Sequence, residues 1–175
     1  MTRIIIIGYM GAGKTTVGKA LAKELGMTFY DLDWYIESRM RKTIPQIFEE
    51  KGEEGFRKIE NTMLHEVAEF EDVILSCGGG TPCFFDNMEY LNRQGHTVYL
   101  KASPDVLYKH LKMGRIERPL LKDKTQEEMQ LFIEKQLEER EPHYLKAKNV
   151  LDVSLMDNYE KIKISVARLR ELLNI

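Results

Sequence analysis

Near its N-terminus the chain reads Ile4-Ile5-Ile6-Ile7-Gly8-Tyr9-Met10-Gly11-Ala12-Gly13-Lys14-Thr15. The last eight residues fit the phosphate-binding loop pattern G-x-x-x-x-G-K-[ST]. The isoleucines before them form an unbroken apolar run, which is typical of a strand buried on both faces. After Lys14, apolar residues recur at helical spacing, at Val17, Leu21 and Leu25, and stop at Gly26. A strand, this loop and a helix in that order are the context that the motif requires.

Each part of the loop predicts a contact with a nucleoside triphosphate. The glycines let backbone N–H groups converge on an anion, and the helix that begins near Lys14 adds its positive end. Lys14 can neutralise the β- and γ-phosphates, and the Thr15 hydroxyl can ligate Mg²⁺. The sequence therefore predicts a site for ATP and Mg²⁺.

The rest of the chain alternates strand-like and helical stretches. Short apolar runs at 28–30, 73–75, 97–100 and 150–153 indicate further strands. Helical patterns cover most of 34–70, with interruptions at 43–45 and 52–55, and continue at 103 onward, 125–139 and 162–173. This alternation predicts an α/β fold with a mostly parallel sheet covered on both faces, and ligands at the carboxyl ends of its strands. Without a repeat or a composition break, we expect one domain over residues 1–175.

Charge and composition exclude several other classes of protein. The 175 residues carry 26 Lys+Arg against 28 Asp+Glu, a net charge of −2. This balance gives no long-range attraction to nucleic acid or to an anionic membrane. Two cysteines make no disulfide scaffold, no apolar run approaches a membrane span, and the N-terminus is not a secretory signal. We expect a cytoplasmic protein.

A pair of acids follows the second predicted strand and a run of three glycines follows the third. Both therefore lie at the same edge of the sheet as the phosphate loop. Asp33 could accept a hydrogen bond from an acceptor hydroxyl and take its proton, and Asp31 could order the Mg²⁺ shell through water. Alternatively, either acid simply caps a helix that begins at Trp34. The triplet Gly78, Gly79 and Gly80 could let a ligand lie against the backbone, or could be an ordinary turn.

Three arginines, Arg57, Arg118 and Arg140, are candidates to bind an anion. Arginine offers a planar fork that suits a carboxylate or a phosphate. Alternatively, each arginine lies on a solvated helix face, because sequence alone does not show that the three converge. The stretch 112–124 is either a lid that closes over ATP or a surface loop.

Motifs that the sequence lacks, and residues without a recognisable pattern, narrow the possible functions. The sequence has no N-K-x-D guanine-reading element and no strand that ends in a Walker B acid, so transfer to a small acceptor is favoured over a GTP switch. Cys77 and Cys83 do not have metal-ligand spacing. The four histidines, His65, His96, His110 and His143, form no H-x-x-x-H pair, and we assign them surface or packing roles.

Taken together, these motifs resemble the shikimate kinase family. The resemblance covers nearly the whole chain, in order: the loop at 8–15, Asp31 and Asp33, Gly-Glu-x-x-Phe-Arg-x-x-Glu from Gly52 to Glu60, the glycine triplet, Arg118-Pro-Leu-Leu, and Arg140 followed by Pro142 and Tyr144. Only the loop is specific by itself, but the combination is highly specific.

The resemblance implies transfer of the ATP γ-phosphate to the 3-hydroxyl of shikimate, a step toward chorismate and aromatic amino acids. It implies that Asp33 binds shikimate and acts as the base, that Arg57 and Arg140 bind its carboxylate, and that Gly78, Gly79 and Gly80 line the site. It further implies ATP contacts from Gly11, Ala12, Gly13, Lys14, Thr15, Thr16 and Arg118, with Lys14 and Arg118 stabilising the transferred group. Thr15 would bind Mg²⁺ directly, and Asp31, with Ser76 as a further candidate, through water.

The family fold is the phosphate-loop, nucleoside-monophosphate-kinase type, with a five-stranded parallel sheet in order 2-3-1-4-5, a substrate-binding helical region at about 33–61 and a lid at about 112–124. The family is usually monomeric and cytoplasmic, and no nucleic-acid or membrane partner is implied. Two rival functions stay open: another small-molecule kinase of this fold, acting on gluconate or a nucleoside monophosphate, and a nucleotide-binding regulatory protein.

Overall fold

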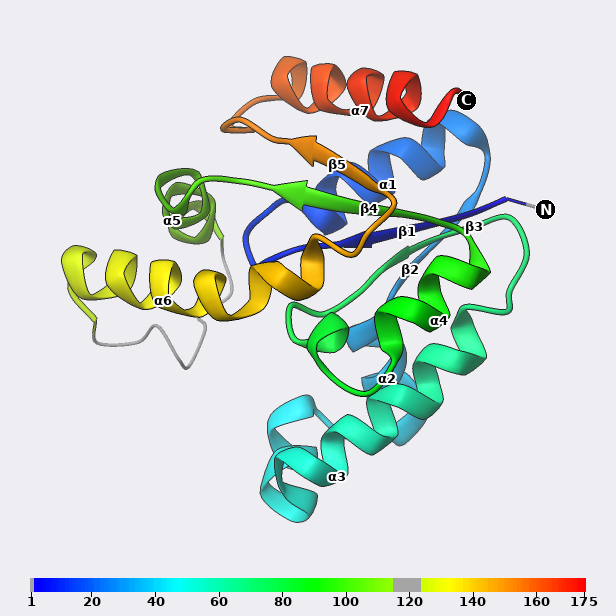
Figure 1. Ribbon diagram of the computed structural model, residues 1–175, viewed down its shortest axis with the longest axis vertical. Coiled ribbons are helices and arrows are strands. Elements are labelled where there is room, and N and C mark those ends of the chain that lie inside the picture. The colour runs from blue at the N-terminus through cyan, green and yellow to red at the C-terminus, as the bar shows by residue number, and fades with distance from the viewer. Residues whose placement is uncertain (1, 115–123) are drawn as a thin grey trace.

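The computed structural model describes residues 2–114 and 124–175 and centres on a five-stranded sheet (Figure 1). β1 (Arg3–Ile7) is the central strand, flanked by β3 (Val73–Ser76) and β4 (His96–Lys101). β2 (Thr28–Asp31) and β5 (Asn149–Asp152) form the two edges. The order is β2-β3-β1-β4-β5 and each pairing is parallel, which confirms the predicted fold.

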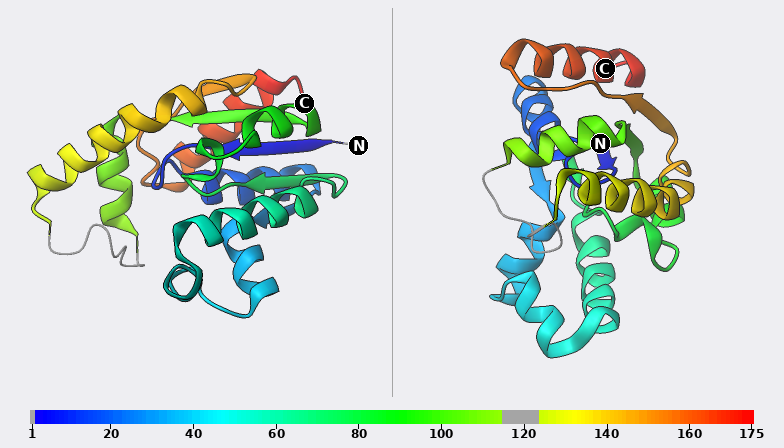
Figure 2. Two further views of the ribbon diagram at one scale, coloured as in Figure 1. Left: turned by 60° about the horizontal axis from the view of Figure 1, so that its bottom comes forward. Right: turned by 90° about the vertical axis from the view of Figure 1, so that its left-hand side faces the viewer.

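Helices cover both faces of the sheet, as predicted. α1 (Lys14–Leu25) and α7 (Tyr159–Leu173) pack together on one face, and α4 (Asn87–Gln94) and the end of α6 (Gln126–Tyr144) lie on the other (Figures 1 and 2). α5 (Pro104–Met113) packs beside α6, beyond the carboxyl end of β4. α2 (Leu32–Met40) and α3 (Ile44–Val67) form a helical pair that projects from the sheet (Figure 2). A short 3₁₀ helix, η1 (Thr81–Cys83), follows the glycine triplet.

Local signals in the sequence explain where these helices begin and bend. Thr43 caps α3 in a capping box with Gln46, which confirms the predicted interruption there. The second interruption is narrower than predicted: Gly52 alone, with φ 69°, kinks α3, and the helix continues through Gly55. α6 extends beyond the predicted end at residue 139, so Arg140 lies on a helix.

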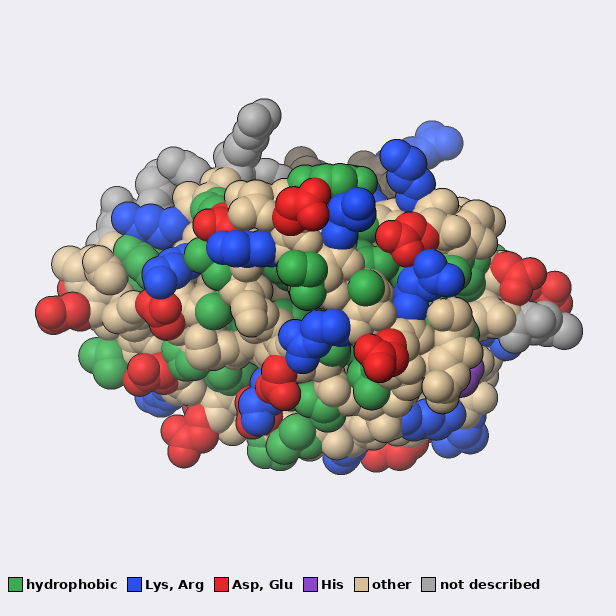
Figure 3. Space-filling view, turned by 90° about the horizontal axis from the view of Figure 1, so that it is seen from above, with side chains coloured by type: hydrophobic (Ala, Val, Ile, Leu, Met, Phe, Trp, Pro, Cys, Tyr) green, Lys and Arg blue, Asp and Glu red, His purple; other side chains and the backbone are tan. Residues whose placement is uncertain are grey.

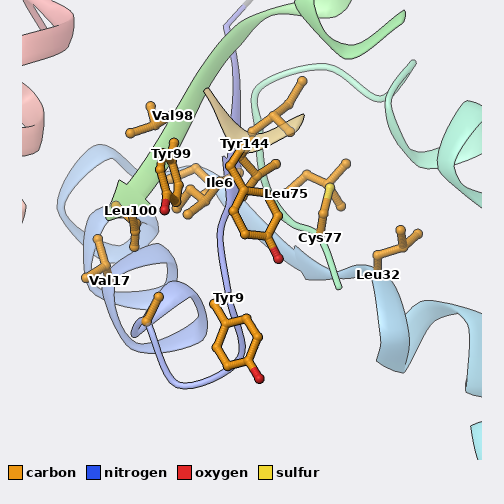
Figure 4. Packing of buried hydrophobic residues seen from close by; sticks show 14 of the residues in the cluster. Ile6, Tyr9, Val17, Leu32, Leu75, Cys77, Val98, Tyr99, Leu100 and Tyr144 are labelled. Atoms are coloured by element: carbon orange, nitrogen blue, oxygen red, sulfur yellow. The ribbon is translucent and has the colours of Figure 1, made fainter. Parts of the chain in front are cut away.

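The core confirms burial on both faces for the inner strands β1 and β3 and for most of β4, whereas the edge strands β2 and β5 are partly exposed. Ile4 to Ile7 are all at most 1% exposed, and the β3 residues Val73 to Leu75 are buried. Large aromatic side chains, Tyr9, Tyr99 and Tyr144, are buried near the carboxyl end of β1 (Figure 4). The core therefore extends to the ends of the strands, where the predicted site residues follow.

The surface carries both signs of charge. On the face seen in Figure 3, basic and acidic side chains are interspersed with apolar ones. Within residues 2–114 and 124–175, the helices are too short or too polar to cross a membrane.

Candidate active site

A cavity of about 370 Å³ opens where β1, β2 and β3 end. Its walls come from the phosphate loop, from the acids after β2, from the segment after β3, and from α5 and the segment after β5. The lining residues are Met10, Gly11, Gly13, Lys14, Thr15, Thr16, Asp31, Asp33, Ser76, Cys77, Gly78, Gly79, His110, Met113, Gly114 and Met156. The predicted edge of the sheet is therefore where the candidate groups meet.

The phosphate loop has the predicted geometry. Gly11 and Gly13 have φ of 84° and 95°, conformations that glycine adopts readily, and α1 begins at Lys14. The Lys14 ammonium donates to the carbonyl oxygens of Gly8, at 2.7 Å, and Tyr9, at 2.9 Å. Ala12 is fully buried and does not line the cavity, so only its backbone is suited to a phosphate contact.

Asp31 caps α2, one of the alternatives left open by the sequence, and also contacts the phosphate loop. One carboxylate oxygen accepts from the backbone N–H of Trp34 at 3.2 Å, so Asp31 is the N-cap of α2. The other accepts from the Thr15 hydroxyl at 3.1 Å. α2 begins at Leu32 and not at Trp34, which places Asp33 inside its first turn and makes the capping explanation wrong for Asp33.

These oxygens fit a magnesium site that is completed by a nucleotide. Mg²⁺ binds oxygen ligands, keeps several waters, and in phosphate-transfer sites is held by few protein groups. Thr15 and Asp31 are hydrogen-bonded to each other on the cavity wall, beside Ser76. Within the described parts of the chain, no cluster of three or more His, Cys, Asp or Glu residues could hold a metal by itself, so the ion would depend on phosphate oxygens and water.

Asp33 has the electrostatic environment of a base. Its pKa is raised from 3.8 to about 6, chiefly by burial and then by the nearby carboxylates of Asp31 and Glu60, while Lys14 opposes the shift. A carboxylate with a pKa near the working pH can both hold a hydroxyl and accept its proton.

The glycine triplet makes room for three functional side chains. A Cβ atom would lie 3.0 Å from Asp33 Oδ1 at Gly78, 3.1 Å from Arg140 Nη1 at Gly79, and 2.6 Å from Arg57 Nη2 at Gly80. The sequence suggested a backbone surface for a ligand. The structure adds that a side chain at Gly80 would collide with Arg57, and that side chains at Gly78 and Gly79 would crowd Asp33 and Arg140.

Arg57 and Arg140 converge on the triplet from α3 and α6, although neither is among the residues that line the cavity. Arg57 is 11% exposed and lies against the Phe84 ring, 4.2 Å from its centroid. Its Nη1 donates to Glu60 at 3.0 Å. Its Nε is buried and makes no hydrogen bond within the described residues, with Glu53 Oε1 at 3.8 Å, so a ligand oxygen could accept from it.

Arg57 has a buried acidic partner on its own helix, Glu60, to which the sequence alone gave no role. Glu60 is 1% exposed, binds Arg57, and accepts from the Thr81 hydroxyl at 2.9 Å. Burial raises the pKa of Glu60, and Arg57 opposes that shift. The i, i+3 spacing on one helix was the signal that could have found it.

His110 is also part of the site, beyond the packing role predicted for it. It donates from Nδ1 to the Gly11 carbonyl at 2.7 Å, and its Nε2 accepts from the Met156 backbone N–H at 2.9 Å. His110 therefore joins the phosphate loop to the segment after β5. No sequence pattern connects these positions. Arg118 and the lid region around it, residues 115–123, lie outside the described residues, while Met113 and Gly114 just before them line the cavity.

The fold and the phosphate loop together define a phosphate-loop kinase. A sequence model of the family described as shikimate kinase matches residues 10–169. The shikimate kinase of Phocaeicola vulgatus is 55% identical over 174 residues, or 99% of each chain. The chain belongs to the shikimate kinase family.

Solved structures of the family agree with this assignment. The crystal structure of shikimate kinase from Bacteroides thetaiotaomicron matches with a TM-score of 0.97 at 50% identity, over 99% of each chain. A shikimate kinase from Acinetobacter baumannii, in complex with shikimate, matches with a TM-score of 0.83 at 32% identity, over 99% of this chain and 94% of that one.

Proposed function

We propose that this protein transfers the γ-phosphate of ATP to the 3-hydroxyl of shikimate, giving shikimate 3-phosphate and ADP. The observation that carries the proposal is the meeting of Asp33, Arg57 and Arg140 around one glycine triplet, beside the phosphate loop. One base and two guanidinium groups suit a small acceptor with hydroxyls and one carboxylate. Family membership and the shikimate complex of the Acinetobacter relative support the same acceptor.

On the acceptor side, we assign the carboxylate to Arg57 and Arg140. The Nε of Arg57, which makes no hydrogen bond within the described residues, supplies a donor, and Glu60 holds the guanidinium through Nη1. Asp33 accepts a hydrogen bond from the reacting hydroxyl and takes its proton as the phosphoryl group is transferred. Gly78, Gly79 and Gly80 leave the space in which these groups meet.

On the donor side, the backbone of residues 11–16 binds the phosphates at the start of α1. Lys14 reaches the β- and γ-phosphates, and Arg118 adds charge from the lid. Thr15 would hold Mg²⁺ directly and Asp31 through water, in keeping with their hydrogen bond on the cavity wall. Bound Mg²⁺ supplies positive charge beside the phosphate oxygens. We expect residues 33–61 to form the acceptor-binding region of a single-domain, cytoplasmic monomer.

An acceptor panel tests the proposal against its rivals. ADP release from Mg·ATP is measured with shikimate, gluconate, a nucleoside monophosphate or no acceptor, for the wild type and Asp33→Asn. We expect release that depends on shikimate and is lost in Asp33→Asn. A site built to pair a carboxylate should reject the nucleoside monophosphate, which lacks one, by about 10⁴ or more, whereas gluconate tests the placement of the hydroxyls. Preference for another acceptor would support a different kinase, and equal release in all conditions would support a regulatory protein.

A further inference from the structure

We infer that Tyr9 is a positioning residue that holds Arg140 in register with the phosphate loop. The inference rests on the proposed function, because it takes Arg140 to bind the acceptor carboxylate. In this arrangement, the Tyr9 side chain fixes the distance between the phosphate site and the acceptor site.

The backbone of Tyr9 is part of the phosphate loop. Its carbonyl oxygen accepts from the Lys14 ammonium at 2.9 Å and from the Ala12 backbone N–H at 3.1 Å. The residue is only 1% exposed, although it lies in a loop. Its main chain is therefore fixed by the same groups that we expect to hold the phosphates.

The side chain of Tyr9 reaches α6 at two points. Its hydroxyl donates to Gln136 Oε1 at 2.6 Å, and the Arg140 guanidinium carbon lies 5.9 Å from its ring centroid. Gln136 and Arg140 are four residues apart on α6, so one helix face presents both groups to Tyr9. Figure 4 shows the Tyr9 hydroxyl pointing away from the sheet.

A second tyrosine joins the Arg140 end of α6 to the glycine triplet. Tyr144, one turn after Arg140, donates to the Gly79 carbonyl at 2.5 Å, and its ring lies 5.1 Å from that of Tyr99. The Cβ position of Gly79 is 3.1 Å from Arg140 Nη1. Arg140 is thus held between the phosphate loop, through Tyr9, and the glycine triplet, through Tyr144.

The hydroxyl is the feature that distinguishes positioning from packing. A phenylalanine or leucine at position 9 could fill the buried space equally well, because filling it needs no polar atom. A hydrogen bond to Gln136 instead fixes the register of α6 against the loop. A bidentate arginine needs such control, since small errors in placement weaken its paired hydrogen bonds.

Steady-state kinetics of Tyr9→Phe test the inference, with shikimate and Mg·ATP varied separately. We expect the KM for shikimate to rise about three- to tenfold, the effect of about one hydrogen bond, with the KM for ATP and kcat within twofold of wild type. The matched control is Tyr99→Phe, because the Tyr99 hydroxyl also donates to α6, to Glu141 at 2.9 Å, but from β4 and not from the phosphate loop. The control should change the KM for shikimate by less than twofold.

A double variant tests whether Tyr9 acts through Arg140. In an Arg140→Ala background, Tyr9→Phe should not raise the KM for shikimate further, whereas independent effects would multiply. An unchanged KM in Tyr9→Phe, an equal rise in Tyr99→Phe, or multiplying effects in the double variant would each overturn the inference while the enzyme still used shikimate. A wild type without shikimate-dependent turnover would instead overturn the proposed function, and the inference with it.

Discussion

An atom at the Cβ position of Gly80 would lie 2.6 Å from Nη2 and 2.9 Å from Nη1 of Arg57. Gly80 itself has φ −92° and ψ −14°, a backbone conformation that any residue adopts. Glycine is therefore required there for space and not for backbone freedom. The guanidinium that fills this space also contacts Phe84 and Glu60, so it has little room to move aside.

Gly80→Ala should therefore displace the Arg57 guanidinium without disturbing the loop backbone. We expect the KM for shikimate to rise about 10- to 100-fold, as for the loss of hydrogen bonds to a charged group, with the KM for ATP little changed. Initial rates at varied shikimate measure this. In an Arg57→Ala background the same substitution should have no further effect, and an additional rise there would contradict the steric explanation.

Arg57→Lys tests the requirement for a planar fork. Lysine keeps the charge but presents a single ammonium, so we expect weaker acceptor binding with nearly unchanged nucleotide binding. Calorimetric titration with shikimate and, separately, with ADP measures both affinities. Arg39→Lys is a matched control, because Arg39 is 54% exposed and pairs across the surface with Glu66. A loss of ADP affinity in Arg57→Lys would show that the carboxylate assignment is wrong.

Arg118→Ala tests a residue outside the described ranges. The prediction comes from its place in Arg118-Pro-Leu-Leu and from the expected charge on the transferred phosphoryl group. An arginine in this role contributes about 10³ to 10⁵ in turnover in phosphate-loop enzymes, so we expect kcat to fall at least about 10³-fold. Circular dichroism should show an unchanged fold. Wild-type turnover in this variant would remove Arg118 from the mechanism.

The sheet and the phosphate loop could be predicted because their signals are local. Ile4 to Ile7 form a continuous apolar run, and the glycine and lysine spacing of the loop has a direct physical meaning. Which of Asp31 and Asp33 caps the following helix could not be predicted, since the two acids lie two residues apart at the end of the same strand. The start of α2 at Leu32 decides between them by making Asp31 the cap.

Contacts between residues far apart in the chain could not be predicted from the sequence. The bond from His110 to Gly11 and that from Tyr9 to Gln136 join positions about a hundred residues apart or more, and no periodicity relates them. The need for space at the glycine triplet likewise depends on two arginines that arrive from α3 and α6. The residue types could be listed from the sequence, but their convergence required the fold.

The pH dependence of the reaction should report the ionisation of Asp33. Because the pKa of its carboxyl is raised to about 6, the base loses its proton-accepting form as the pH falls through that value. We expect kcat/KM for shikimate to fall about tenfold per pH unit below pH 6 and to be level above it, until another group titrates. A profile that stays level down to pH 5 would show that no base with a pKa near 6 controls this step.

The same raised pKa predicts that Asp33→Asn is more stable than the wild type at neutral pH. The folded protein binds the Asp33 proton up to about pH 6, whereas the unfolded chain releases it near 3.8. The folded state therefore binds more protons between these values, so wild-type stability falls as the pH rises through this window. At pH 7.5 the penalty is at most about 3 kcal/mol, and asparagine removes it. We expect the melting temperature of Asp33→Asn to be several degrees higher, at about 2–4 °C for each kcal/mol, and the difference to shrink at pH 4. Asp105→Asn, whose side chain is 58% exposed, should show no such gain, and a lower melting temperature for Asp33→Asn at pH 7.5 would contradict the raised pKa.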